Sequence, residues 1–144
     1  MDDSGASNLE RDHMITLLII DPNIPFQQSL KKLLIKHFPG VDIKVAIDQK
    51  TALKKIETIE PQIILLEIHL PGRSGLELAG LIKSKHPAAI IALLTSYNLP
   101  EYQKAAQDSG IEHLIPKDEW TGDDIISLVQ SIVSDLEYDI QERR

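Results

Sequence analysis

The sequence predicts a three-layer α/β fold in which helices cover both faces of a five-stranded parallel sheet. Short, nearly continuous apolar runs alternate along the chain with longer amphipathic stretches. Apolar runs without polar alternation indicate strands that are buried on both faces, as in a parallel sheet. Most of the amphipathic stretches begin and end with residues typical of helix starts and stops. A length of 144 residues with 42% hydrophobic residues suits one domain with a sizeable core.

Five apolar runs are the expected strands. They are rich in Ile, Leu and Val, which favour strands, and contain few polar residues. The runs span residues 15–20, 43–47, 63–68, 90–95 and 113–115.

The first two helices are predicted by their end signals. Asn23 is a preferred N-cap residue and Pro25 suits a first turn, so the first helix begins here and ends before Pro39. Asp48 is the expected N-cap of the second helix, and Pro61 lies beyond its end. In both stretches apolar residues recur every three or four positions, which predicts one buried face.

The third and fourth helices each begin at a possible capping box. Ser74 and Glu77 have the required spacing, and so do Asn98 and Glu101. Gly110 ends the fourth helix, since glycine is common just past a helix C-terminus.

The fifth helix begins at Thr121, with Asp124 three residues later. We expect a domain over residues 14–136, preceded by a disordered lead over residues 1–13. Residues 137–144 are either a tail or the end of the fifth helix. The apolar stripe of this helix is the most regular in the chain and comprises Ile125, Val129, Ile132 and Leu136.

Right-handed crossovers restrict how five such units can be wound, and the most economical result is a doubly wound, flavodoxin-like (βα)5 sheet of order 2-1-3-4-5. In such sheets ligands and chemistry gather at the carboxyl ends of the strands. The residues that end the first, third, fourth and fifth runs are Asp21, Glu67, Thr95 and Lys117. These side chains are therefore the candidate functional residues.

Composition limits the partners and the compartment. The chain has a net charge of -7 and no distinct basic patch, so we expect no direct nucleic-acid binding. It has no cysteine, no signal peptide and no apolar stretch long enough for a membrane span. These features predict a cytoplasmic protein without membrane attachment.

Each candidate residue also has an ordinary structural explanation. Asp21 suits a helix start, Thr95 suits a strand end, and Lys117 suits the surface after a short strand. Glu67 is different because it closes an apolar run, so its carboxylate must reach solvent or find a partner. The arrival of all four at strand ends favours a shared site.

Four segments resemble the receiver domains of two-component response regulators, over about residues 14–136. The resemblance implies that an acidic pair ends the first strand, an aspartate the third, a Thr or Ser the fourth and a lysine the fifth. In active receivers carboxylates and a loop carbonyl hold magnesium, and the third-strand aspartate takes phosphate from a histidine kinase. Asp21, Thr95 and Lys117 match this pattern. The segments are LLIIDPN, IILLEIHLPGRSGLEL, IIALLTSY and HLIPKDEW.

Two positions depart from the pattern that the resemblance implies. Pro22 stands where the second acid of the pair is expected, and Glu67 stands where the phosphoacceptor aspartate is expected. Magnesium requires tight octahedral geometry, so a lost carboxylate and a longer one leave a degenerate metal site made of Asp21, Pro22 and Glu67. We expect magnesium binding to be lost or weak and no other cofactor to be bound.

The residues that would report the state of the site also differ. Receivers usually carry an aromatic residue three positions before the conserved lysine, and here that position is Leu114. The usual coupling is therefore expected to be weakened or rerouted through His113 or Tyr97. Trp120 either anchors a partner or lies over the start of the fifth helix.

Glu67 permits two interpretations. Its longer carboxylate reaches toward the volume of a phosphoryl group, where it could meet Lys117 and the Thr95 hydroxyl as a permanent mimic of the phosphorylated form. Alternatively, a Glu67–Lys117 ion pair simply neutralises a leftover pocket.

The sequence thus predicts an atypical receiver, or pseudo-receiver, that is not an enzyme and acts through protein binding. The partner would be a histidine kinase, another receiver or a transcription component, bound through the fourth helix, fifth strand and fifth helix. A homodimer through the same face is possible. The alternative is an active phosphorelay receiver that uses Glu67 or an altered site around Asp21. A flavin binder is disfavoured because Pro22 and Pro25 occupy the turn where a phosphate loop needs small residues.

Overall fold

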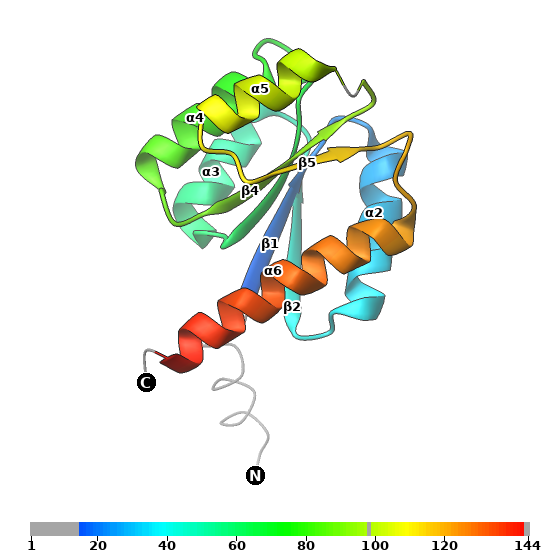
Figure 1. The fold of residues 1–144 in the computed structure, drawn as a ribbon, viewed down its shortest axis with the longest axis vertical. Helices are drawn as coiled ribbons and strands as arrows, with labels where there is room; N and C mark the ends of the chain where they lie inside the picture. The colour runs from blue at the N-terminus through cyan, green and yellow to red at the C-terminus, as the bar shows by residue number, and fades with distance from the viewer. Residues whose placement is uncertain (1–14, 98, 143–144) are drawn as a thin grey trace.

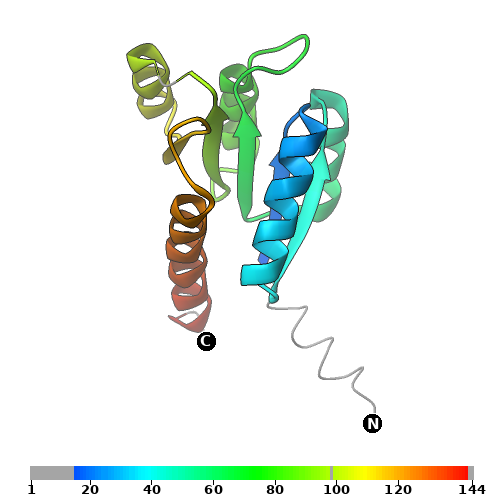
Figure 2. The same ribbon diagram turned by 90° about the vertical axis from the view of Figure 1, so that its right-hand side faces the viewer.

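The computed structural model describes residues 15–97 and 99–142, so the predicted lead over residues 1–13 lies outside the described part. Five parallel strands form one sheet in the order β2-β1-β3-β4-β5, which confirms the predicted fold and topology. Helices α2 and α6 cover one face, and α3, α4 and α5 cover the other (Figures 1 and 2). The elements are β1 (Ile15–Ile20), α2 (Ile24–His37), β2 (Val41–Ala46), α3 (Gln49–Ile59), β3 (Ile63–Glu67), α4 (Gly75–Lys85), β4 (Ile90–Thr95), α5 (Pro100–Asp108), β5 (His113–Pro116) and α6 (Gly122–Glu142).

The predicted bounds of three strands were wrong at their ends, since β5 extends to Pro116, one residue beyond the prediction, and β2 ends one residue early, at Ala46. Strand β2 begins at Val41, not at residue 43, and pairs there with Ile15. As an edge strand it needs only alternate apolar residues, so Asp42 and Lys44 interrupt the apolar run without ending the strand. Strand β3 ends at Glu67, one residue earlier than predicted.

Three helices begin as the sequence predicts. The Asn23 side chain accepts a hydrogen bond from Phe26 N at the start of α2. Asp48 accepts one from the N–H of residue 51 at the start of α3. At the start of α6, Thr121 N donates to Asp124 Oδ2 and Asp124 N donates to Thr121 Oγ1, which is the reciprocal pattern of a capping box.

The other two helix starts differ from the predicted capping boxes. Ser74 is the N-cap of α4, but its hydroxyl accepts from Leu76 N. Helix α5 begins at Pro100, and its N-cap position is Leu99, which makes no side-chain cap bond. Proline lacks an N–H and has its φ fixed near the helical value, so this start has one fewer donor to satisfy. The predicted N-cap, Asn98, lies outside the described residues.

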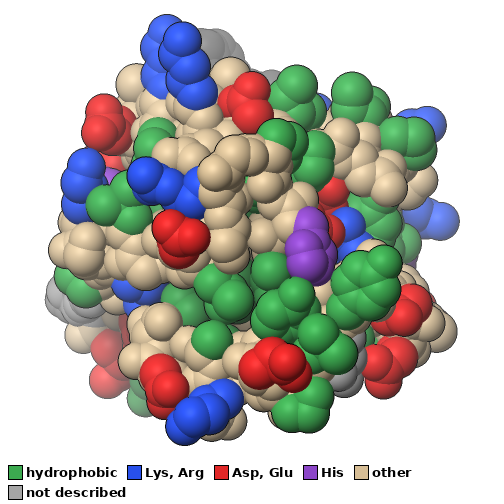
Figure 3. All heavy atoms as spheres, turned by 90° about the horizontal axis from the view of Figure 1, so that it is seen from above, with side chains coloured by type: hydrophobic (Ala, Val, Ile, Leu, Met, Phe, Trp, Pro, Cys, Tyr) green, Lys and Arg blue, Asp and Glu red, His purple; other side chains and the backbone are tan. Residues whose placement is uncertain are grey.

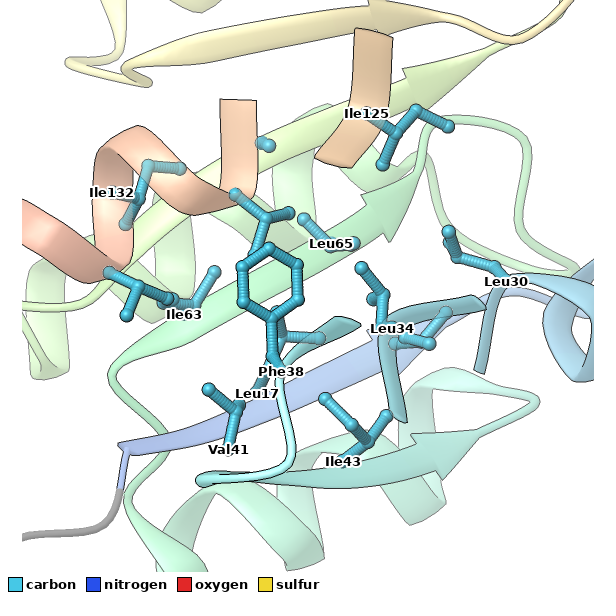
Figure 4. Close-up of a cluster of buried hydrophobic side chains, with 14 of the residues drawn as sticks. Leu17, Leu30, Leu34, Phe38, Val41, Ile43, Ile63, Leu65, Ile125 and Ile132 are labelled. Carbon is cyan, nitrogen blue, oxygen red and sulfur yellow. The ribbon is translucent and has the colours of Figure 1, made fainter. Parts of the chain in front are cut away.

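The core lies on both sides of the sheet. Side chains from α2 and α6 interdigitate with Leu17, Ile63 and Leu65 on one face (Figure 4). The three central strands, β1, β3 and β4, contribute consecutive buried residues, which explains why their sequences show no alternation. Among the described residues, no helix combines the length and hydropathy that a bilayer crossing requires.

Helix α4 begins unusually close to the end of β3. Gly75 N donates to Ile68 O at 2.6 Å, and a Cβ at Gly75 would meet the Glu67 carbonyl oxygen and lie 2.8 Å from Ile68 Cα. Only glycine permits this approach, which sets the position of the loop that follows Glu67.

Replacing Gly75 by Ala is therefore expected to lower the free energy of unfolding by about 1–3 kcal/mol through overpacking. Gly80→Ala is a matched control, because no atom lies within 4 Å of a Cβ there and alanine favours the interior of α4. Denaturant unfolding measures both variants. Equal stability of the two would show that the backbone at Gly75 yields freely.

Candidate functional site

The four predicted residues come together at the carboxyl edge of the sheet. Asp21 follows β1, Glu67 ends β3, Thr95 ends β4 and Lys117 follows β5, and these strands are neighbours in this order. Asp21 and Thr95 have no exposed surface, and Glu67 is 5% exposed. Two carboxylates are thus withdrawn from water and need partners within the protein.

Lys117 is the partner of both carboxylates. Its Nζ lies 2.5 Å from Glu67 Oε1 and 2.6 Å from Asp21 Oδ2. The same ammonium lies 4.2 Å from the centroid of the Phe26 ring, within the range of a cation–π contact. The Lys117 side chain is only 11% exposed, so these contacts are weakly screened by solvent.

The remaining carboxylate oxygens are bound by backbone N–H groups. Asp21 Oδ1 accepts from Asn23 N, and Glu67 Oε2 accepts from His69 N, both at 2.8 Å. Asp21 Oδ2 has no hydrogen-bond donor with good geometry among the described residues, so its contact with Lys117 is an ion pair. Burial raises the pKa of the Asp21 carboxyl, while Lys117 and the Asn23 N–H oppose this rise.

The Asp21→Asn variant tests whether burial of the Asp21 carboxylate outweighs its stabilisation by Lys117 and the Asn23 N–H. Since the folded pKa lies above its ordinary value of 3.8, the folded chain binds this proton more tightly than the unfolded chain. The contribution of Asp21 to stability is therefore greatest at pH values below its ordinary pKa of 3.8, and it is lost as the pH rises through the pKa of the folded state.

We accordingly expect Asp21→Asn to be at least as stable as the wild type at about pH 7, and its advantage to shrink on acidification. Urea unfolding across this pH range is the measurement. An advantage that grows as pH falls would contradict the sign of the shift.

Two residues of α2 support the site although the sequence analysis did not place them there. Phe26 does so through the contact of its ring with Lys117, and Gln27 does so through hydrogen bonds. Gln27 is buried, and its Nε2 donates to Asp21 O at 3.1 Å and to Ala46 O at 2.9 Å. It thereby ties the ends of β1 and β2 together beneath Asp21. A glutamine among the apolar residues of an amphipathic helix was the only available signal.

Thr95 lies at the site, but its hydroxyl is bound elsewhere. Thr95 Oγ1 accepts from Tyr97 N and donates to Tyr97 O, both at 3.0 Å. Thr95 Oγ1 makes no hydrogen bond with Glu67, which is the contact that the interpretation of Glu67 as a phosphoryl mimic allowed. Lys117 is nevertheless tied to this strand, since Lys117 N donates to Thr95 O at 2.8 Å.

His69 connects Glu67 to the loop after β4. Its N–H binds the Glu67 carboxylate, and its ring packs edge-on against Tyr97 and Tyr102 at centroid distances of 5.7 and 5.8 Å. Figure 3, which views the molecule from above, shows a histidine beside a group of hydrophobic side chains. A continuous series of contacts therefore runs from Glu67 to the start of α5.

The side of α5 and β5 carries a groove of about 360 Å³. Its lining includes Leu114, His113 and Trp120. Leu114 is half-buried and packs against the core beneath α5, and Trp120 is half-buried against the core beneath α6. Trp120 thus lies beside the start of α6 and also faces the groove.

The donor set does not fit the magnesium ion that active receivers hold. Pro22 supplies no side-chain oxygen, and the Lys117 ammonium lies within 2.6 Å of an oxygen of each remaining acid. A divalent cation between Asp21 and Glu67 would have to displace a positive charge already bonded to both. Within residues 15–97 and 99–142, no three His, Cys, Asp or Glu side chains are grouped so as to hold a metal.

Comparison with known proteins agrees with this architecture. The sequence matches the response regulator receiver domain family over residues 17–130. It is 36% identical over 85 residues to the transcriptional regulatory protein YdfI of Bacillus subtilis, covering 59% of this chain and 39% of that protein. It is 24% identical over 103 residues to the DNA-binding transcriptional activator EvgA of Escherichia coli, covering 71% and 50%. The chain thus spans half or less of the length of these relatives.

A solved structure of a two-component response regulator from Clostridium difficile superimposes with a TM-score of 0.77 at 26% identity. The match covers 84% of this chain and 97% of that one. The family match spans most of the sheet and helices, and the four strand-end residues described above lie within it. The chain therefore belongs to the receiver domains of response regulators.

Proposed function

We propose that this chain is an atypical receiver that regulates signalling or transcription by binding another protein and is not phosphorylated. The observation that carries this proposal is the Lys117 ammonium, which forms ion pairs with Glu67 and Asp21 together. The charge that a receiver normally gains on phosphorylation is here part of the chain.

Both oxygens of Glu67 are already engaged, which argues against an acceptor role. Oε1 binds Lys117 Nζ and Oε2 binds His69 N. Phosphoryl transfer depends on an aligned nucleophile and on cationic neutralisation of the transferred group. Glu67 is longer than the usual aspartate and Pro22 replaces a metal ligand, so both requirements are weakened.

The contacts of Glu67 support a partial mimic of the phosphorylated state. Glu67 makes the contact with Lys117 that a phosphoryl group would make, but the hydroxyl of Thr95 is turned to Tyr97. A carboxylate also has one charge and two oxygens, fewer than a phosphoryl group. The site therefore carries a permanent negative charge without closing the usual Thr contact.

The partner surface we propose is formed by α5, β5 and α6. Its groove offers Leu114 and Trp120, and an amphipathic tryptophan is a frequent anchor in interfaces. The partner class is a histidine kinase, another receiver or a transcription component. The last is supported by relatives described as transcriptional regulators. The chain binds this partner as a cytoplasmic signalling protein and performs no catalysis itself.

Incubation with a small phosphodonor and magnesium tests the proposal. Intact mass is expected to show no added phosphoryl group, because Glu67 is engaged and magnesium is expected to bind weakly or not at all. The same experiment on a receiver that keeps both aspartates is the positive control. A wild-type mass increase that disappears in Glu67→Gln would identify Glu67 as an acceptor and overturn the proposal in favour of phosphorelay.

A further inference from the structure

Strand β2 is an open edge of the sheet, since among the described residues it pairs only with β1. Asp21 N donates to Ala46 O, so the backbone groups of Ala46 face β1. Backbone groups alternate in direction along a strand, and those of Ile43 and Val45 therefore face outward. The described residues provide no hydrogen-bond partner for these two N–H groups. An edge of this kind is a template for another strand.

One lysine of α3 lies along this open edge. Lys55 Nζ donates to Val45 O at 2.5 Å, and the lysine is half-buried because α3 packs against β2. Within the described part of the chain, Lys55 forms no ion pair with an acid. A strand arriving at the edge would have to displace this ammonium or bury it without a carboxylate, and both are costly.

The two charged residues of β2 itself would not oppose the β2 strand of a second copy. Asp42 and Lys44 form an ion pair with each other at 3.6 Å, so together they add no net charge to the edge. If two β2 strands met antiparallel around Ile43, Asp42 of each copy would face Lys44 of the other, and opposite charges in this position favour pairing. The two Ile43 residues would then exchange N–H···O bonds. Lys55 is thus the group that opposes an otherwise self-complementary edge.

We propose that Lys55 blocks strand addition at β2 and thereby prevents two copies of this chain from joining their sheets edge to edge. The ammonium occupies the outward carbonyl of Val45 and places an unpaired positive charge where the second strand would lie. Lysine is a residue that β-sheet proteins commonly use to protect an exposed edge. The loss of this one side chain is therefore expected to expose the edge for pairing.

This role of Lys55 is separate from the function proposed above. Strand β2 lies at the opposite edge of the sheet from β5, which contributes to the proposed partner surface. The inference therefore does not depend on whether Glu67 is phosphorylated or on which partner is bound.

The Lys55→Met variant of the full chain tests the proposal, because it removes both the charge and the hydrogen-bond donor. Sedimentation equilibrium is expected to show self-association at least about tenfold tighter than in the wild type. Hydrogen exchange followed by NMR should show that the amides of Ile43 and Val45 become protected as the concentration of the variant rises. Lys54→Met is the matched control, since Lys54 is the exposed neighbour on the same helix and should behave as the wild type does.

Two further variants tie the effect to the edge. Lys55→Gln removes the charge but stays polar, so it should also associate, and it replaces Lys55→Met if that variant does not fold. Adding Val45→Pro to either variant removes an outward N–H but no bond to β1, and should abolish the gain in association. If the folded Lys55 variants associated no more than Lys54→Met at high micromolar concentration, the proposal would be overturned. Association that persists with Val45→Pro, or that leaves exchange at Ile43 and Val45 unchanged, would overturn it as well.

Discussion

Replacing Lys117 by Met is expected to lower the free energy of unfolding by about 3–5 kcal/mol, which is the cost of leaving buried charge without a partner. Asp21 and Glu67 are nearly inaccessible to water, and Lys117 is the cation bonded to both. Methionine keeps an unbranched side chain one heavy atom shorter than that of lysine, so the loss reports mainly the missing charge. Denaturant unfolding with a two-state fit is the measurement.

Two further variants separate this effect from general damage. Lys54→Met changes an exposed lysine and is expected to alter stability by less than about 0.5 kcal/mol. Adding Asp21→Asn and Glu67→Gln to Lys117→Met removes both buried charges and should restore much of the lost stability. If Lys117→Met alone changed the free energy of unfolding as little as Lys54→Met, the ion pairs of Lys117 would make no measurable contribution to stability.

The double change of Pro22→Asp with Glu67→Asp is expected to create a phosphorylatable receiver. It returns a carboxylate where a metal ligand is missing and shortens the acceptor by one methylene. Errors of about 1 Å in the position of a reacting group cost roughly 100-fold in rate, so a gain of at least this size is expected. Intact mass after treatment with phosphodonor and magnesium measures the gain.

The single variants define what the double change must achieve. Glu67→Asp alone restores the acceptor length but leaves Pro22 in place, so its phosphorylation should stay poor. Pro22→Ala with Glu67→Asp removes the proline without adding an oxygen and is the matched control. Rapid phosphorylation of Glu67→Asp alone would show that Pro22 has little importance for the metal.

The order of the strands and the meeting of four residues could be predicted because they follow from periodicity and topology. Apolar runs such as those of β1 and β3 have no alternation, which favours strands of a parallel sheet that is buried on both faces. Parallel strands end at the same edge, so Glu67 and Lys117 were expected to meet although fifty residues separate them. Their contact follows from the fold.

Other features depend on local geometry that one-dimensional patterns do not contain. The edge strand β2 tolerates Asp42 and Lys44, so its start could not be read from an apolar run. The Thr95 hydroxyl could form a hydrogen bond with Glu67 or with the backbone of Tyr97. The path of the loop after β4 determines that it binds Tyr97. Gln27 was missed for the same reason, because its partners are carbonyls exposed by the ends of two strands.

Beryllofluoride, a phosphoryl analogue, tests whether the site that we propose to be closed by Lys117, Glu67 and Asp21 can accept a phosphoryl group. This phosphoryl analogue, added with magnesium to isotope-labelled protein, is followed through backbone amide chemical shifts. We predict no saturable change in the wild type and a saturable change in the Pro22→Asp, Glu67→Asp variant. Saturable wild-type shifts centred on Glu67, Thr95 and Lys117 would show instead that the unchanged site accepts the analogue.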